Sequence, residues 1–72
     1  MERNMQYVNS SNLRLVGYNH MTETLTIQFH SGHVYEYYHV PKHVYDGLMF
    51  ASSKGKYHHR YIKNSYPYNR LQ

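Results

Sequence analysis

The strongest candidate for chemistry is the sequence SSKGK at residues 52–56, which is predicted to open a helix. A helix start offers free backbone amides and the positive end of the helix dipole, and both favour a phosphate or a carboxylate. Two hydroxyls and two lysines would add to that attraction; the residues are Ser52, Ser53, Lys54, Gly55 and Lys56. Plain capping is the alternative interpretation, because serines and a glycine begin many helices. The full phosphate-loop sequence GxxxxGK[ST] is absent, so nucleotide hydrolysis is not predicted.

Positive charge continues along the predicted helix, which covers roughly residues 54–64. Helical spacing places four basic side chains on one face: Lys56, His59, Arg60 and Lys63. The opposite face holds His58, Tyr61, Ile62 and Ser65. The basic face is either a ligand contact or an ordinary solvated helix surface.

The chain has ten tyrosines and no tryptophan. A tyrosine ring can stack on a nucleotide base, or it can bury its flat face in the core while its hydroxyl forms a hydrogen bond. Tyr35 and Tyr37 are predicted to lie mostly in the core. Tyr18, Tyr38 and Tyr57 are predicted to present their rings to a ligand or to a second subunit.

Seven histidines raise the question of a metal site, and the nearest pairs are His30 with His33 and His58 with His59. Sequence neighbours point apart on a helix, and no thiol or nearby carboxylate completes a tetrahedral set. We therefore predict polar surface or core-edge histidines, with no metal and no cofactor.

Catalysis would need a nucleophile, a base and an orienting acid within reach of one another. The chain has only four acidic residues, none of them paired, and no nucleophile motif; they are Glu2, Glu23, Glu36 and Asp46. We predict a binding protein and not an enzyme, with metal-free cleavage using His59 as the alternative.

The length and composition set the scale of the fold. With 72 residues and no cysteine, there is room for one hydrophobic core and no disulfide to stabilise it. We expect one domain over residues 1–72, with its core over about 8–68, and association into a homo-oligomer. The net charge of +4 favours anionic partners but is also an ordinary solubility charge. Without a long apolar run or signal peptide, we expect a cytoplasmic protein with no membrane contact.

Three strands are predicted in the first half of the chain. Residues 13–18 (LRLVGY) form the first, residues 24–30 (TLTIQFH) alternate strictly between apolar and polar side chains, and residues 33–38 (HVYEYY) favour strand. If Gly32 closes a type I turn in the left-handed conformation, Ile27 pairs with Tyr35 and Leu25 with Tyr37. A two-residue turn would instead bury the carboxylate of Glu36, so we prefer the first register.

Two helices are predicted to follow. Pro41 suits a first helical position, and residues 41–51 carry an apolar stripe made of Val44, Tyr45, Leu48 and Ala51. Ser52 and Ser53 can cap the second helix, and Pro67 ends it. The tail either packs back through Tyr68 and Leu71 or frays. The expected fold is α+β: a three-stranded antiparallel meander followed by two helices packed on one face.

The order of several segments resembles the KTSC domain, a short module named after the end of some bacterial lysyl-tRNA synthetases. The segments are SSNLRLVGY, TLTIQFHSG, YEYYHVP and ASSKGKYHHRYIKNSYPY. Its most specific marks here are the YxY at Tyr35 and Tyr37 and the pair Val40 and Pro41. His58 and His59 depart from the Phe and Asn common in the family. The resemblance implies a compact sheet with helices against it, and its synthetase connection suggests RNA binding.

Together these features predict capture of a phosphate-bearing ligand. A small nucleotide needs few donors and an aromatic lid, and two copies meeting around it would enlarge the pocket that one small domain can build. We therefore expect sequestration of a small nucleotide at or near a homo-oligomer interface, as in phage decoy proteins. An RNA-binding accessory is the first alternative, and a protein-interaction module is the second.

Overall fold

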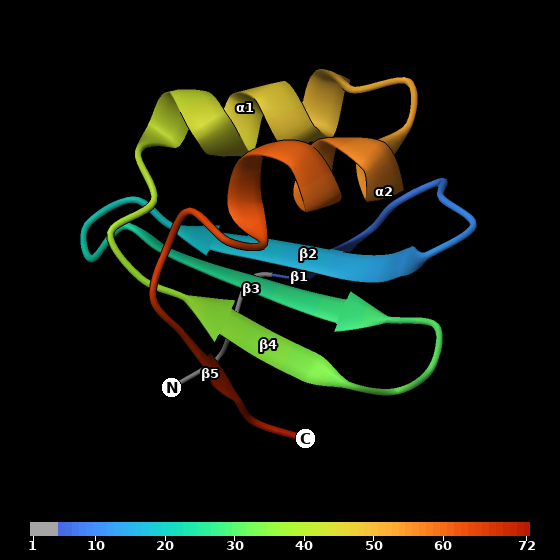
Figure 1. Ribbon diagram of the computed structural model, residues 1–72, viewed down its shortest axis with the longest axis horizontal. Coiled ribbons are helices and arrows are strands. Elements are labelled where there is room, and N and C mark those ends of the chain that lie inside the picture. Colours follow the sequence, from blue (N-terminus) through green and yellow to red (C-terminus); the bar gives the residue numbers. More distant parts are fainter. Residues whose placement is uncertain (1–4) are drawn as a thin grey trace.

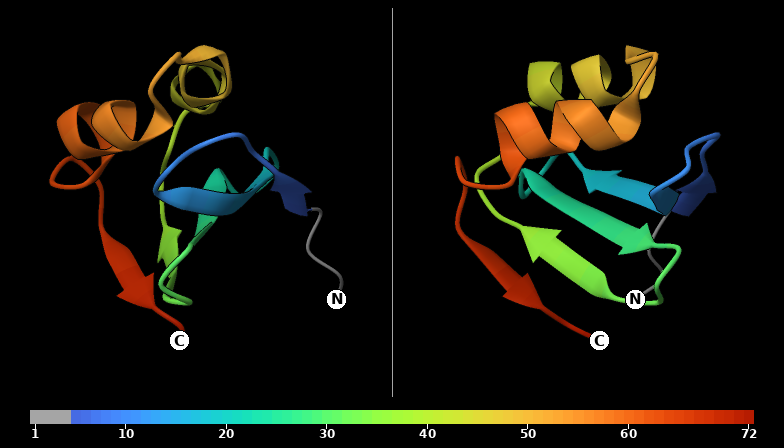
Figure 2. Two further views of the ribbon diagram at one scale, coloured as in Figure 1. Left: turned by 90° about the vertical axis from the view of Figure 1, so that its right-hand side faces the viewer. Right: turned by 45° about the vertical axis from the view of Figure 1, so that its right-hand side comes forward.

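The computed structural model describes residues 5–72, which form a five-stranded antiparallel sheet with the helices on one face (Figure 1). The elements are β1 (Met5–Tyr7), β2 (Leu13–Asn19), β3 (Thr24–Phe29), β4 (Val34–Tyr37), α1 (Lys42–Phe50), α2 (Lys54–Tyr57), η1 (His58–Ile62) and β5 (Tyr68–Arg70). The strands lie in the order β1-β2-β3-β4-β5. The α+β class is confirmed, but the predicted three-strand count is wrong, because a short strand is added at each edge. The tail does pack back: it forms β5 beside β4 (Figure 2).

The hairpin between β3 and β4 has the preferred register. Leu25 pairs with Tyr37 and Ile27 with Tyr35. The amide of Gly32 donates to the Phe29 carbonyl over 2.9 Å, and Gly32 has a φ of 96°. Glycine adopts this left-handed conformation without the penalty that a Cβ would bring. The turn therefore directs Tyr35 and Tyr37 to the side of the sheet that faces the helices.

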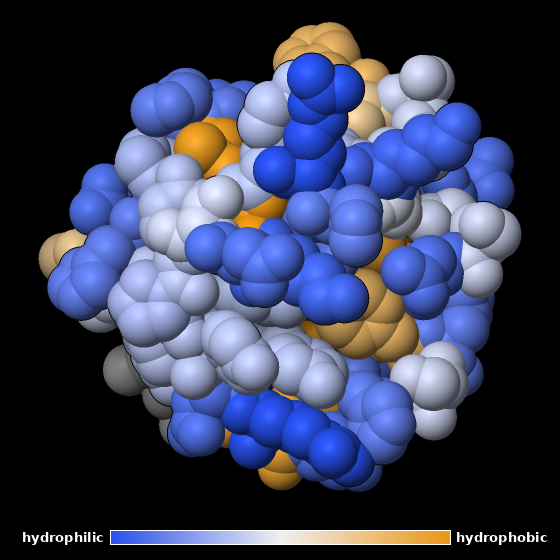
Figure 3. Space-filling model, in the orientation of Figure 1, coloured by the Kyte–Doolittle hydropathy of each residue, from blue (hydrophilic) through white to orange (hydrophobic). Residues whose placement is uncertain are grey.

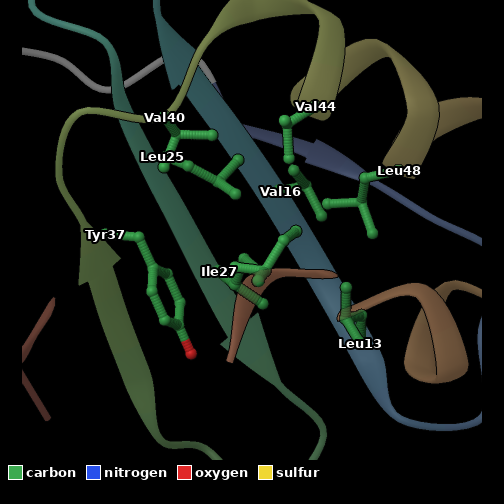
Figure 4. Close-up of a cluster of buried hydrophobic side chains, with 9 residues drawn as sticks. Leu13, Val16, Leu25, Ile27, Tyr37, Val40, Val44 and Leu48 are labelled. Atoms are coloured by element: carbon green, nitrogen blue, oxygen red, sulfur yellow. The ribbon is translucent and has the colours of Figure 1, made fainter. Parts of the chain in front are cut away.

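The core lies between this face of the sheet and the helices (Figure 4). It consists of Leu13, Val16, Leu25, Ile27, Tyr37, Val40, Val44, Leu48 and Ile62, all buried. Tyr37 lies at the margin of this cluster, with its hydroxyl directed away from Leu25 and Val40. The prediction that Tyr37 is a core residue is confirmed, and Tyr35 is half-buried.

The first helix begins one residue later than predicted. Pro41 has a ψ of 152°, so it caps the helix in an extended conformation, and Lys42 is the first helical residue. The carbonyl of Pro41 still accepts the amide of Val44 over 3.0 Å. Val44 and Leu48 are buried, as the apolar stripe predicted.

The second helix is not a continuous α-helix. After one turn, α2, the chain widens into a π-helix, η1, in which the amide of Lys63 donates to the carbonyl of His58 over 2.8 Å. His58 and Ile62, which were assigned to the face opposite the basic one, are buried. Tyr61 was assigned to the same face but is 49% exposed. The five-residue bond changes the angular spacing of the side chains, and π-turns of this kind are often found at functional sites.

No helix within residues 5–72 is long and apolar enough to cross a membrane.

Candidate functional site

A pocket of about 350 Å³ lies between η1 and the sheet, beside the hairpin that joins β3 and β4. Four aromatic side chains form one part of its lining: Phe29, Tyr35, Tyr37 and Tyr68. Four basic or imidazole side chains form another part: His33, His58, His59 and Lys63. The remaining lining residues are Asn12, Ser31, Gly55 and Asn64. The pocket therefore draws on segments from both halves of the chain.

The aromatic part is a connected set of rings. The centroid of Tyr35 lies 5.8 Å from that of Phe29 and 5.5 Å from that of Tyr68. The centroids of Tyr37 and Tyr68 are 5.7 Å apart. These separations lie within the range of favourable ring contacts, so β5 extends the wall that β4 begins. Tyr68 is 56% exposed and leaves much of its ring open to a ligand.

The buried end of the pocket holds a hydrogen-bonded pair. The hydroxyl of Tyr37 lies 2.8 Å from Nε2 of His58, and both side chains are buried. The pKa of His58 is lowered to about 4, chiefly by burial and then by the charges of Lys63 and His59. Burial also raises the pKa of Tyr37 to about 12, with smaller contributions from Tyr35 and Tyr68. Both groups are therefore uncharged at neutral pH.

The outer part of the pocket carries the positive charge. His59 and Lys63 are exposed. The lining residue His33 has a basic neighbour outside the lining: the guanidinium of Arg70 lies 3.0 Å from Nδ1 of His33. Nδ1 of His33 is also 3.4 Å from the backbone oxygen of Gln72, but the shorter Arg70 contact decides its role. A guanidinium can only donate, so Nδ1 of His33 accepts.

Acidic side chains are absent from the lining within residues 5–72. The three acidic residues in this part of the chain lie elsewhere: Glu23, Glu36 and Asp46. Asp46 pairs with Lys42 on α1 over 3.0 Å. The pocket thus combines aromatic rings with basic groups, and residues 5–72 place no aspartate or glutamate side chain in it to repel an anion.

The structure brings only some of the sequence-predicted site residues to this pocket. Gly55, His59 and Lys63 line it. Lys56 and Arg60 are exposed on the same helical segment but do not line it, and Arg60 lies over the ring of Tyr61 with its Cζ 5.6 Å from the centroid. The predicted basic face is therefore divided between the pocket and open solvent.

The helix start is largely engaged in contacts within the protein. The hydroxyl of Ser53 accepts the amide of Lys56 over 3.4 Å, while Ser52 is exposed and supplies no cap. The ammonium of Lys54 donates to the carbonyls of Met49 and Ala51 over 3.1 and 3.0 Å. These carbonyls end α1, so Lys54 caps the preceding helix.

We expect Lys54→Met, which keeps the apolar stem and removes the ammonium, to lower the free energy of unfolding by about 1 kcal/mol. Urea denaturation of this variant beside Lys56→Met tests the expectation, because Lys56 is exposed and its side chain makes no such contact. Equal changes in both variants would show that the two Nζ hydrogen bonds contribute nothing measurable.

The three tyrosines predicted to present their rings lie outside the pocket. Tyr18 stacks on Tyr45 at a centroid distance of 4.7 Å, and its hydroxyl donates to the Val40 carbonyl over 2.6 Å. Tyr57 is half-buried against α1 at Gly47, where an added Cβ would lie 2.8 Å from its Cζ. Tyr18 thus joins the sheet to α1, and Tyr57 joins α2 to α1.

Tyr38 is also half-buried, and its hydroxyl donates to a carboxylate oxygen of Glu36 over 2.9 Å. Its amide donates to the Pro67 carbonyl over 2.9 Å. Tyr38 thus helps to hold the segment that leads into β5. It does not contribute to the pocket lining.

Three histidines line the pocket, yet residues 5–72 contain no group of three or more His, Cys, Asp or Glu side chains arranged to hold a metal ion. His30 lies apart, with its Nε2 2.9 Å from the carbonyl of Ser10.

Comparisons with known proteins identify relatives of this chain. The chain is 48% identical over 54 residues to a lysine–tRNA ligase of Trichormus variabilis and 41% identical over 59 residues to one of Nostoc punctiforme. These matches cover 75% and 82% of this chain but only 10% of each ligase. A protein of Tsukamurella paurometabola is 37% identical over 59 residues, which cover 82% of this chain and 88% of that protein.

The fold also matches a crystal structure. A KTSC domain protein of Yersinia pestis superposes with a TM-score of 0.91 at 30% identity, and the match covers 99% of this chain and 100% of that one. The family model of the KTSC domain matches residues 9–66. This chain therefore belongs to the KTSC domain family.

Proposed function

We propose that the chain binds a small phosphate-bearing ligand with an aromatic ring, such as a nucleotide, in the pocket between η1 and the sheet. The observation that carries the proposal is the composition of this pocket: the described part of the chain lines it with four aromatic rings and four basic or imidazole groups, and with no aspartate or glutamate side chain. Rings suit a base, and exposed cations suit a phosphate. The role is capture without catalysis, and it would serve to sequester a nucleotide.

The size of the pocket supports a small ligand. Its volume of about 350 Å³ is near the lower end of the usual range for ligand sites, about 300–1,000 Å³. The exposed ring of Tyr68 and the exposed side chain of Lys63 leave one side of it open. A second copy of the chain would cover this side, and we therefore propose that binding occurs at or near a homo-oligomer interface.

Two lysine variants test the proposal. Lys63→Gln removes a cation that lines the pocket, and Lys56→Gln removes one from the same helical segment outside it. Calorimetric titration with nucleoside monophosphates should show binding roughly fivefold weaker in Lys63→Gln, because one exposed charge contact is worth about 1 kcal/mol. Lys56→Gln should bind like the wild type. Equal losses in both variants, or no binding of any nucleotide by the wild type, would contradict the proposal.

RNA binding is the second candidate function. It is favoured by the similarity to a segment of lysine–tRNA ligases, enzymes that act on RNA. That similarity also supports a cytoplasmic location for this chain, which we propose with it. The exposed Tyr68 and the neighbouring Arg70 in β5 could contact an unpaired base and a phosphate. Affinity that rises with RNA length and falls steeply with salt would favour this candidate over capture of a small nucleotide.

The surface seen in Figure 3 is better suited to binding an anionic ligand than to binding a partner protein through a broad apolar interface. It is covered mainly by hydrophilic and intermediate residues, with hydrophobic atoms showing only in small patches between them. Docking of another protein on this face would therefore depend largely on polar contacts.

A further inference from the structure

The pair formed by Tyr37 and His58 differs from the other polar groups of the pocket in its burial. Tyr37 is 3% exposed and His58 7% exposed. They come from different elements, β4 and η1, and meet through the 2.8 Å contact between the hydroxyl and Nε2. The ring of Phe29 packs against His58 at a centroid distance of 5.2 Å. The imidazole is thus held in one orientation by a hydrogen bond on one side and an aromatic contact on another.

The second ring nitrogen of His58 is not engaged by residues 5–72. Within this part of the chain, Nδ1 of His58 has no hydrogen-bond partner, while Nε2 is bonded to Tyr37. In the same residues, no fully buried side-chain nitrogen or oxygen lacks a partner, so Nδ1 is not fully buried. Because His58 lines the pocket, Nδ1 is the ring nitrogen left for a ligand there.

The pair can present either hydrogen-bonding character. If the Tyr37 hydroxyl donates to Nε2, Nδ1 of His58 carries the hydrogen and is a donor. If Nε2 instead donates to the hydroxyl oxygen, Nδ1 is an acceptor and the hydroxyl hydrogen is free. In both arrangements the pair remains neutral, since burial lowers the pKa of His58 to about 4. A neutral group in this position suits a polar, uncharged part of a ligand, because it brings no positive charge to offset the charge of a phosphate.

The charged groups of the pocket are more exposed than the Tyr37–His58 pair. Lys63 and His59 are exposed at its outer part, whereas Phe29, Tyr37 and His58 surround its buried part with rings. A phosphate is best solvated beside exposed cations, and burying it among rings would remove its hydration without a compensating charge. A nucleotide in this pocket would therefore place its phosphate outward and its base inward.

We propose that the Tyr37–His58 pair determines specificity, with Nδ1 of His58 forming a hydrogen bond to the base of the bound nucleotide. This inference rests on the proposed function, since it concerns the same pocket. It assigns the two ends of the ligand to different residues: the base to His58, positioned by Tyr37, and the phosphate to Lys63 with His59. Loss of the Nδ1 contact then changes which base is preferred, while loss of Lys63 changes the affinity for any phosphate.

The test compares two substitutions of His58 and two kinds of ligand. In His58→Gln the side-chain amide occupies the place of Nε2 and can still bond Tyr37, but Nδ1 is lost. In His58→Asn the amide occupies the place of Nδ1, and the bond to Tyr37 is lost. The ligands are the four nucleoside monophosphates and ribose 5-phosphate, which has the phosphate but no base.

We expect His58→Gln to bind the preferred nucleoside monophosphate roughly 3- to 10-fold more weakly, as for one lost hydrogen bond, with ribose 5-phosphate unchanged. His58→Asn should retain part of the base preference. Lys63→Gln should bind both the nucleoside monophosphate and ribose 5-phosphate more weakly. Equal losses of both ligands in His58→Gln, or no loss of either, would overturn the inference while leaving nucleotide binding intact. Absence of nucleotide binding by the wild type would instead contradict the proposed function.

A measurement on the wild-type protein does not depend on the folding of any variant. Nitrogen-15 NMR of the histidine rings should show a shift of Nδ1 of His58 when the preferred nucleoside monophosphate is added. Ribose 5-phosphate should leave this resonance in place. A resonance that is unmoved by both ligands, while the nucleotide binds, would overturn the assignment of the base to His58.

Discussion

Acidification from pH 7 to pH 4 is expected to lower the free energy of unfolding by about 3 kcal/mol through His58 alone. The pKa of His58 is lowered to about 4 in the folded protein, chiefly by burial and then by the charges of Lys63 and His59. In the unfolded chain the ordinary value of about 6.5 applies. Between these values the unfolded chain binds a proton and the folded protein does not. Stability is therefore complete above about pH 6.5 and falls as the pH is lowered toward 4.

Melting temperatures measured between pH 4 and pH 8 test this expectation. The wild type should lose stability steeply below about pH 6.5, and His58→Gln should show a much flatter profile because the substituted amide does not titrate. His20→Gln is the matched control, since His20 is exposed in the turn after β2. A profile for His58→Gln that is as steep as the wild-type profile would assign the pH dependence to other groups.

Ile62→Ala is expected to lower the free energy of unfolding by about 2–5 kcal/mol. Ile62 is fully buried in the core and lies at the end of η1. Removing its outer carbons leaves a cavity and loosens the attachment of η1 to the sheet. Because η1 carries His58 and His59 and precedes Lys63, ligand affinity should fall as well.

Urea denaturation gives the stability of this variant, and Ile62→Val is its graded control with an expected loss of about 0.5–1.5 kcal/mol. Nucleotide titrations on both variants, at a temperature where they remain folded, separate stability from binding. An Ile62→Ala protein that is strongly destabilised but binds the nucleotide as tightly as the wild type would show that the pocket does not depend on the anchoring of η1.

The hairpin between β3 and β4 could be predicted because several local requirements agree there. Gly32 adopts the left-handed conformation that the turn needs, and the resulting register keeps Glu36 away from the core while directing Tyr35 and Tyr37 to the helix side. The apolar stripe of α1 follows the helical repeat equally well. Such repeats can be recognised in the sequence because apolar side chains favour the core and polar side chains favour the solvent.

The edge strands could not be predicted in the same way. Met5–Tyr7 and Tyr68–Arg70 contain three residues each, too few for an alternating apolar pattern to indicate a strand. They form because β2 and β4 present unpaired backbone groups to them, a tertiary effect that local sequence does not encode. Missing β5 also hid the contribution of Tyr68 to the pocket.

The site predicted from the sequence centres on the first turn of the second helical segment, whereas the residues of this segment that line the pocket lie mostly further along it. Lysines beside a helix start are usually interpreted as anion ligands, yet the charge of Lys54 is directed back to the end of α1. The sequence signal for His58 was its position: it lies four residues before Ile62, on the face opposite the predicted basic face. The position of His58 alone did not indicate a polar pair in the pocket. Its partner, Tyr37, lies on a strand 21 residues away, so the pair can be recognised only in the folded structure.

The π-turn also constrains changes in chain length. In an α-helix each residue advances by about 100°, so deleting one residue from η1 would restore ordinary helical spacing and rotate everything after it by more than a quarter turn. Either Ile62 would leave the core or Lys63 would leave the pocket. Insertions and deletions should therefore be tolerated in the loop that follows β2, but not within residues 58–62.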